Sequence, residues 1–143
     1  MNYIFIIFIF LIISILFYLI ILSSSKLLQL LIIVFFSLFL QNICFDHPPN
    51  KSIFIYKHGL SIVITTLRHH SLNIDVNKQG LSLLFYILTD SIQSKFHLID
   101  ARKGALSLGI ITVIEAAQIN FKGESTIQDP CNYLLQILAT EFD

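Results

Sequence analysis

Gly59-Leu60-Ser61-Ile62-Val63-Ile64-Thr65-Thr66-Leu67-Arg68-His69-His70 opens a pattern that the chain contains twice. After a polar step it continues as Val76-x-x-x-Gly80-x-x-Leu83-Leu84. The second copy begins with Gly109-Ile110-Ile111-Thr112-Val113-Ile114-Glu115-Ala116-Ala117 and continues as Ile127-x-x-x-Cys131-x-x-Leu134-Leu135. Gly59 and Val76 are 17 positions apart, and Gly109 and Ile127 are 18 apart. A recurring helical pair is typical of a solenoid, whose units bury their apolar faces on one another and bind partners rather than catalyse reactions.

Apolar periodicity predicts an all-α fold without a sheet. Helices are expected at 3–22, 27–45, 60–70, 74–89, 98–107, 109–121 and 130–141. The β-branched run Ser61 to Thr66 alone would suit a strand, so a strand at this position would contradict the all-α prediction most directly. The residues expected to share a face are Ile62, Val63, Thr66 and Leu67 in the first copy, and Val76, Gly80, Leu83, Leu84 and Ile87 in its next helix. One continuous core is expected from Leu67, Leu84, Ile87, Val113, Ile114, Leu134 and Leu138.

Several residues indicate helix boundaries and close contacts. Ser71 and Asn73 are expected to cap the helix at 74–89, because short polar side chains accept hydrogen bonds from the first turn. Gly80 costs about 1 kcal/mol relative to alanine inside a helix, which indicates close approach by a helix packed across it. Proline is unfavourable inside a helix, so Asp129 is expected to cap a shortened last helix that begins at Pro130, or a kink is expected there.

The first third of the chain has a different composition. Residues 1–45 contain one charged side chain, Lys26, whereas residues 46–143 carry eight basic and nine acidic side chains. The apolar run 3–22 is long enough to cross a hydrocarbon core of ~30 Å, and 27–45 is a second, more polar run. Residues 1–45 are therefore predicted to form a two-helix transmembrane hairpin, followed by a linker or partial helix at 46–58.

Two further considerations bear on residues 1–45. Their Ile, Phe, Leu, Ser, Tyr and Asn content also matches translated AT-rich noncoding DNA, so a gene-model artefact is the rival interpretation. Lys51, Lys57 and Arg68 follow the second run, and the positive-inside rule then places both chain termini in the cytoplasm. The expected location is the membrane with the repeat half cytoplasmic, or the cytoplasm if residues 1–45 are an artefact.

From Gly59 to Asp90 the sequence resembles an armadillo repeat, with an apolar second helix, a polar step and a third helix. Ala101 to Thr140 is similar to the next repeat of such an array, and HEAT repeats share much of the pattern. The resemblance implies an armadillo-like α-solenoid of about two repeats over 59–143. An array usually needs three or more units. The apolar segment 1–45, a second chain or further sequence is therefore expected to cover its ends.

The same resemblance suggests where a partner would bind. Third helices line the concave groove of an armadillo array, and the core register leaves Tyr86, Asn132 and Gln136 on or near the flank that faces it. Of the pair Phe85-Tyr86, one ring is expected to face away from the core. Armadillo proteins that hold extended peptides often carry asparagine late in the third helix, where this chain has Tyr86 and Ile137. That difference argues against peptide clamping of the importin kind.

Catalytic, cofactor and metal chemistry find no support in the sequence. His69-His70 point about 100° apart on a helix and cannot easily share a metal. No phosphate loop, nucleophile elbow or His-Glu-x-x-His is present. Cys131 is expected to be a buried apolar residue, Cys44 suits burial or acylation near a membrane, and Arg102-Lys103 is expected at the surface. The near-neutral net charge indicates no basic surface of the kind that binds nucleic acid.

The sequence thus predicts a non-enzymatic protein-interaction module, possibly held at a membrane through residues 1–45. It needs no cofactor and no small-molecule substrate, and its partner is a protein. Two alternatives remain open at this point. The chain would otherwise be a small integral membrane subunit of a larger complex, or a fragment of a longer soluble armadillo protein.

Overall fold

The computed structural model describes residues 30, 33–34, 37–40, 48–56, 58–89 and 95–139. The regular structure of these residues is entirely α-helical, which confirms the predicted all-α fold, and Ser61 to Thr66 are helical rather than a strand. The helix expected at 3–22 lies outside the described residues, as does much of the one expected at 27–45. No helix in the described ranges is both long and apolar enough to cross a membrane.

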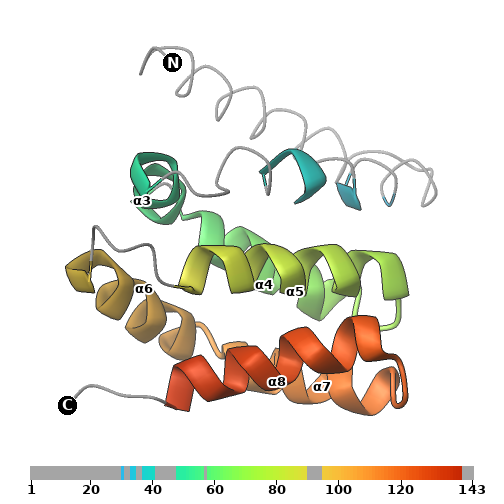
Figure 1. Ribbon diagram of the computed structural model, residues 1–143. Helices are drawn as coiled ribbons and strands as arrows, with labels where there is room; N and C mark the ends of the chain where they lie inside the picture. Colours follow the sequence, from blue (N-terminus) through green and yellow to red (C-terminus); the bar gives the residue numbers. More distant parts are fainter. Residues whose placement is uncertain are drawn as a thin grey trace.

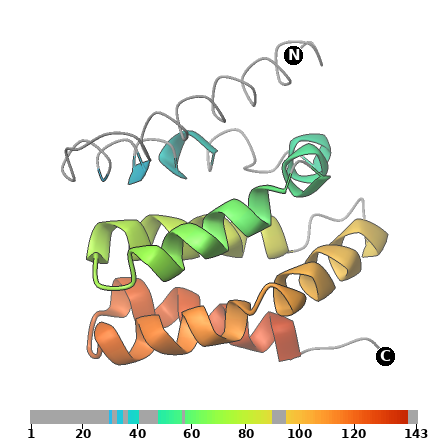
Figure 2. The same ribbon diagram turned by 180° about the vertical axis from the view of Figure 1, so that it is seen from behind.

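The labelled helices fall into two consecutive groups of three. They are α3 (Pro48–Tyr56), α4 (Gly59–His69) and α5 (Ile74–Leu88), then α6 (Lys95–Ser107), α7 (Ile110–Asn120) and α8 (Ser125–Ala139). α4 and α5 form one antiparallel pair, and α7 and α8 form another stacked against it (Figure 1). α5 and α8 lie side by side in one layer, and the view from behind shows α4 and α7 in the other (Figure 2).

Both copies of the sequence pattern form helices of the same length. α4 and α7 have 11 residues each, and α5 and α8 have 15 each. Equivalent positions of the first helices are buried in both copies, namely Leu60 with Ile110, Val63 with Val113, Ile64 with Ile114, and Leu67 with Ala117. In the second helices Val76, Leu83 and Ile87 are buried, as are their counterparts Ile127, Leu134 and Leu138. The alignment of the two copies therefore identifies positions with the same burial.

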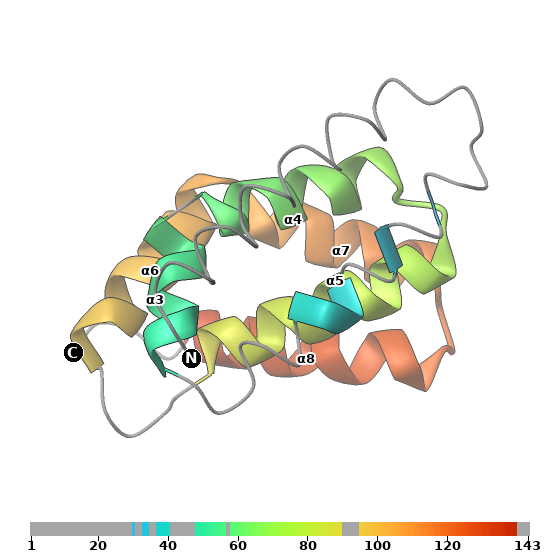
Figure 3. The ribbon, with the colours of Figure 1, turned by 90° about the horizontal axis from the view of Figure 1, so that it is seen from above.

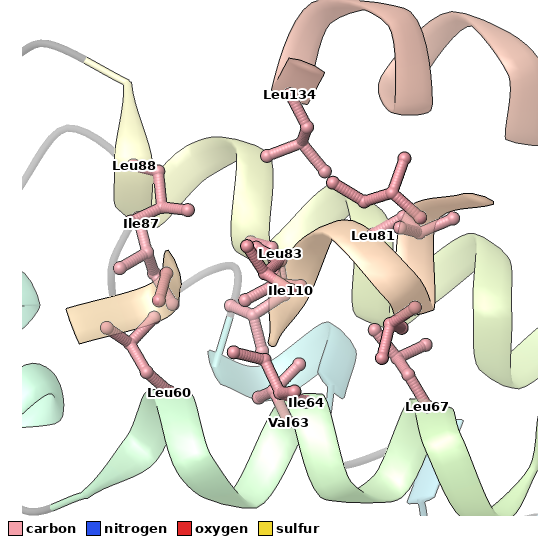
Figure 4. Packing of buried hydrophobic residues seen from close by; sticks show 14 of the residues in the cluster. Leu60, Val63, Ile64, Leu67, Leu81, Leu83, Ile87, Leu88, Ile110 and Leu134 are labelled. Atoms are coloured by element: carbon pink, nitrogen blue, oxygen red, sulfur yellow. The ribbon is translucent and has the colours of Figure 1, made fainter. Parts of the chain in front are cut away.

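The predicted core is present in full. Leu67, Leu84, Ile87, Val113, Ile114, Leu134 and Leu138 are each no more than 5% exposed and belong to one hydrophobic cluster. Leu60, Val63, Ile64 and Leu67 extend from α4 into the same packed interior as Leu83 of α5 and Ile110 of α7 (Figure 4). The predicted face of α4 is wrong in part, because Ile62 and Thr66 are only half-buried and the buried face is centred on Leu60, Ile64 and Leu67.

Close contacts explain why two helical positions are occupied by glycine. A Cβ atom at Gly80 would lie 2.7 Å from Leu67 Cδ2, so the predicted close approach comes from α4. At Gly59 the Phe54 ring of α3 occupies the space of a side chain. The predicted cap at Asn73 is confirmed, since its Oδ1 accepts a hydrogen bond from Val76 N at 3.0 Å. Ser71 instead contributes its carbonyl oxygen, which accepts from Asn120 Nδ2 at 3.0 Å.

The predicted start of the last helix is wrong. α8 begins at Ser125, so Pro130 lies inside it and Asp129 does not cap it. Tertiary contacts hold the first turn in helical form despite the proline: Ile127 is fully buried, and Gln128 Nε2 donates to the Gln118 and Phe121 carbonyl oxygens at the end of α7. These contacts offset the hydrogen bond that Pro130 cannot donate.

Two other boundaries differ from the sequence prediction. α6 begins at Lys95, three residues before the expected position. The segment 46–58, expected to be a linker or partial helix, contains α3, which starts at Pro48 and Pro49. Proline is well tolerated in a first helical turn, because the N–H groups there have no partner in the helix.

Part of the second apolar run, 27–45, belongs to the hydrophobic core. Ile33 and Leu40 are 6% and 3% exposed and lie in the same hydrophobic cluster as residues of α4, α5, α7 and α8. The described parts of residues 30–40 lie over α5 in the view from above (Figure 3). The expectation that the oily segment covers an end of the helical stack therefore holds for this stretch.

Candidate functional site

An aromatic cluster spans the α5–α8 layer and is the strongest candidate for a functional surface. Phe85 of α5 lies between two tyrosines, with ring centroids 5.9 Å from Tyr86 and 5.9 Å from Tyr133 of α8. The ring planes are inclined by 62° and 48°, arrangements that aromatic pairs favour over face-to-face stacking. We call Phe85, Tyr86 and Tyr133 the aromatic ridge.

The helix register explains why this ridge reaches the surface. On α5 the buried residues include Gly80, Leu84 and Leu88, which leaves Phe85 at the edge toward α8 and Tyr86 further round the helix. Phe85 packs against the core as a partly buried residue, and Tyr86 is half-buried. Tyr133 is 57% exposed. The ridge thus combines a partly buried base at Phe85 with an exposed tip at Tyr133.

The three residues predicted to bind a partner lie on two helices, Tyr86 on α5 and Asn132 and Gln136 on α8. Tyr86 belongs to the ridge. Asn132 faces α7, because its Oδ1 accepts a hydrogen bond from Gln118 Nε2 at 2.9 Å. Gln136 is exposed on α8. Asn132 therefore ties α7 to α8, and of the three predicted residues Tyr86 is the one whose ring packs in the ridge.

Tyr133 was missed by the sequence reasoning. It precedes the two core leucines Leu134 and Leu135, and it lies two positions after Cys131 of the apolar pattern. The available signal was its register, since a residue next to Leu134 on a helix is rotated by about 100° away from the core. Asn132 is next to the buried Cys131 and is rotated from it by the same angle, on a different flank of the helix. Register alone could therefore not distinguish Tyr133 from Asn132.

Two arginine side chains bond to backbone carbonyl groups of other elements. Arg68 Nη2 of α4 donates to the Leu108 carbonyl oxygen at 3.0 Å and so joins α4 to the α6–α7 junction. Arg102 Nε donates to the Leu88 carbonyl oxygen at 3.2 Å, at the end of α5. Arg102, expected at the surface, is partly buried there, and its hydrogen bond joins α6 to α5. Lys103 is exposed as expected.

The remaining candidate residues are cysteines and histidines. Burial raises the pKa of the Cys131 thiol to about 11, which keeps it protonated and matches the predicted apolar role. Burial and the neighbouring His69 lower the pKa of His70. Across the part of the chain that the structure describes, no three His, Cys, Asp or Glu side chains gather as a metal site would require. Cys44 and His47 lie outside the described residues.

Comparisons with known proteins return no match, either to a family model, to a curated protein or to a solved structure.

Proposed function

We propose that this protein is a non-enzymatic interaction module, built as a short armadillo-like array whose third helices, α5 and α8, bind a protein partner. The aromatic ridge, which is exposed at Tyr133, carries the proposal. Tyrosine and phenylalanine are enriched at the centres of protein interfaces, where they bury large areas at low cost in side-chain entropy. The ridge lies on the helices that would line the groove of such an array.

The organisation of the chain supports the armadillo-like part of the proposal. Each unit has three helices, a first helix (α3 or α6), then an 11-residue helix and a 15-residue helix. The first and second helices of each unit meet at a residue with left-handed backbone, His58 (φ 62°) or Gly109 (φ 76°). Stacked units with the same junctions are what a solenoid requires.

The chemistry of the ridge points to a partner that presents apolar or aromatic side chains. Its centre consists of aromatic rings, and the exposed charges on the same two helices are of both signs, such as Lys78 and Asp129. Electrostatic steering of a strongly charged partner would need a surface whose charges all have one sign. Tyr86 stands where an asparagine would bind an extended peptide backbone, so an amphipathic helix is the better match.

The test compares partner recovery from native membranes with the full-length protein and single variants. Tyr133→Ala and Tyr86→Ala are expected to reduce recovery of a common protein by more than about tenfold, since a hot-spot aromatic contributes more than ~2 kcal/mol. Tyr56→Ala is the matched control, because Tyr56 is a 79% exposed tyrosine on α3, away from the ridge. Circular dichroism confirms that each variant is folded.

Equal recovery of every protein by the wild type and both ridge variants would overturn the proposal. Recovery that depends on Leu72 or Ile119 instead would favour the structural-subunit alternative. Those residues are 80% and 76% exposed, next to Ser71 and Asn120, whose hydrogen bond joins the two helical pairs. Both residues lie at that end of the molecule.

A further inference from the structure

The two 15-residue helices differ on the side that leads toward the next unit. On α5 this side packs against α8, where the centroid of the Phe85 ring lies 5.9 Å from that of Tyr133. Leu81 and Leu88 lie four residues before Phe85 and three after it, and so share its face of the helix. Both are fully buried, as is Leu84 between them. We call Leu81, Leu84, Phe85 and Leu88 the stacking face of α5.

The equivalent face of α8 has different residues and surroundings. Gly80 and Cys131 occupy the same place in the two copies and are 51 positions apart. The same shift gives the stacking face of α8 as Asn132, Leu135, Gln136 and Ala139. Leu135 packs against the core, whereas the two amides and the alanine are exposed. The face that joins α5 to the next unit is therefore largely polar and open to water on α8.

Hydrogen bonds of equivalent side chains differ in the same way. In the first copy Arg68 of α4 donates to the Leu108 carbonyl oxygen of the following unit at 3.0 Å. Its equivalent in α7 is Gln118, 50 positions later. Gln118 Nε2 donates at 2.9 Å to Asn132 Oδ1, which belongs to the same helical pair. A side chain that joins two units in the first copy thus bonds within its own unit in the second.

We propose that α6, α7 and α8 form a terminal unit of the array, in which water, rather than a further helical unit of this chain or another, covers the stacking face of α8. The inference rests on the armadillo-like array of the proposed function. A terminal unit of a solenoid needs a polar outer face. Burying the amides of Asn132 and Gln136 beneath another helix would also cost free energy unless each amide found new hydrogen-bond partners.

A terminal unit also defines which side of α8 a partner contacts. Tyr133 follows Asn132 directly and is rotated from it by about 100° around the helix, so the aromatic ridge and the stacking face are different sides. The partner binds at Tyr133 and leaves Asn132 and Ala139 in water. The binding surface then consists of the third helices of two units, α5 and α8.

Thiol labelling in cell extract, where bound partners are retained, tests the proposal on the full-length protein. Asn132→Cys and Ala139→Cys each place a thiol on the stacking face of α8. A maleimide should modify both within about threefold of the rate for Lys122→Cys, an exposed position between α7 and α8, because modification follows exposure. Mass spectrometry locates the modified residue. Cys131 is the internal control, since it is fully buried and should remain unmodified.

Slowing of both introduced thiols by more than about tenfold relative to Lys122→Cys would show that another structure covers the face, and it would overturn the proposal. Repeating the labelling with Tyr133→Ala identifies that structure. Slow labelling that persists indicates a further unit, and slow labelling that disappears indicates the partner. Fast labelling combined with unchanged partner recovery by Tyr133→Ala would support the terminal unit and remove the proposed function.

A matched pair of exchanges tests the difference between the two faces in the purified protein. Leu81→Asn gives α5 the residue of α8 and should lower the Tm by more than about 10 °C, because it places an amide in the core. Asn132→Leu is the reverse exchange at an exposed position and should shift the Tm by no more than about 2 °C. Equal losses would show that the two faces have the same surroundings and would contradict the terminal unit.

Discussion

Gly80 illustrates how one residue relates the sequence to the packing of two helices. Its position in the middle of α5 carries a cost in helix propensity, and the structure shows the compensating contact. A Cβ atom there would lie 2.7 Å from Leu67 Cδ2 and 3.0 Å from Leu67 Cγ. Leu67 is only 1% exposed, so its side chain has little room to move. The second copy has Cys131 at this position, where a small side chain is also buried.

Gly80→Ala should therefore destabilise the protein although alanine is the better helix former. Overpacking costs about 1–3 kcal/mol, and the gain in helix propensity offsets about 1 kcal/mol of it, so a net loss of about 1 kcal/mol in the free energy of unfolding is expected. Gly104→Ala in α6 is the control, because no atom lies within 4 Å of its added Cβ. It should stabilise by about 0.5–1 kcal/mol in urea unfolding. A stabilising effect at both positions would contradict the packing of Leu67 on Gly80.

At the same scale, the sequence identified buried residues better than exposed contacts. Core positions follow from periodicity, because one helical face must leave water, and every residue predicted for the core is buried. The direction of a polar side chain depends on its neighbours in space. Asn132, predicted to face a partner, is exposed, and its amide oxygen also accepts a hydrogen bond from Gln118 of α7, a contact that the sequence did not predict. The exposed ring of Tyr133 was likewise not predicted.

Helix boundaries were predicted well where a local signal defines them. α4 and α5 begin and end within a residue of the expected positions, since Asn73 caps α5 and the polar step separates the two helices. The start of α8 was misjudged because Gln128 and Ile127 hold its first turn through contacts with α7 and the core. Proline is a local signal, and here long-range contacts outweigh it.

The capping of α5 provides a test at this scale. Asn73→Ala should lower the free energy of unfolding by about 1 kcal/mol, because the N–H group of Val76 loses its acceptor. Ser71→Ala, two residues earlier, should have a much smaller effect, since Ser71 contributes only its backbone carbonyl to the bond with Asn120. Both values come from urea unfolding followed by circular dichroism. An equal loss for the two variants would mean that both residues cap α5, as the sequence suggested.

For the whole molecule, the two helical pairs share one interior. α5 and α8 lie along each other, and Leu84 and Leu134 are fully buried members of the same cluster. Arg68 joins α4 to the carbonyl of Leu108 before α7, and Asn120 joins the end of α7 to Ser71. This continuity could be expected from the repeated pattern, whereas the contribution of Ile33 and Leu40 could not. Residues of an apolar run look alike in sequence, so periodicity does not show which face meets protein.

Leu84→Ala should consequently destabilise both pairs together. The loss of a fully buried leucine side chain costs about 2–5 kcal/mol, depending on how far the cavity collapses. Because the α5–α8 contact is shared, hydrogen exchange should accelerate in α7 and α8 as well as in α4 and α5, by the same free energy wherever exchange requires global unfolding. Leu72→Ala, on a residue that is 80% exposed, should change exchange in neither pair. Faster exchange in α4 and α5 alone would show that the pairs unfold independently and that the core is not cooperative.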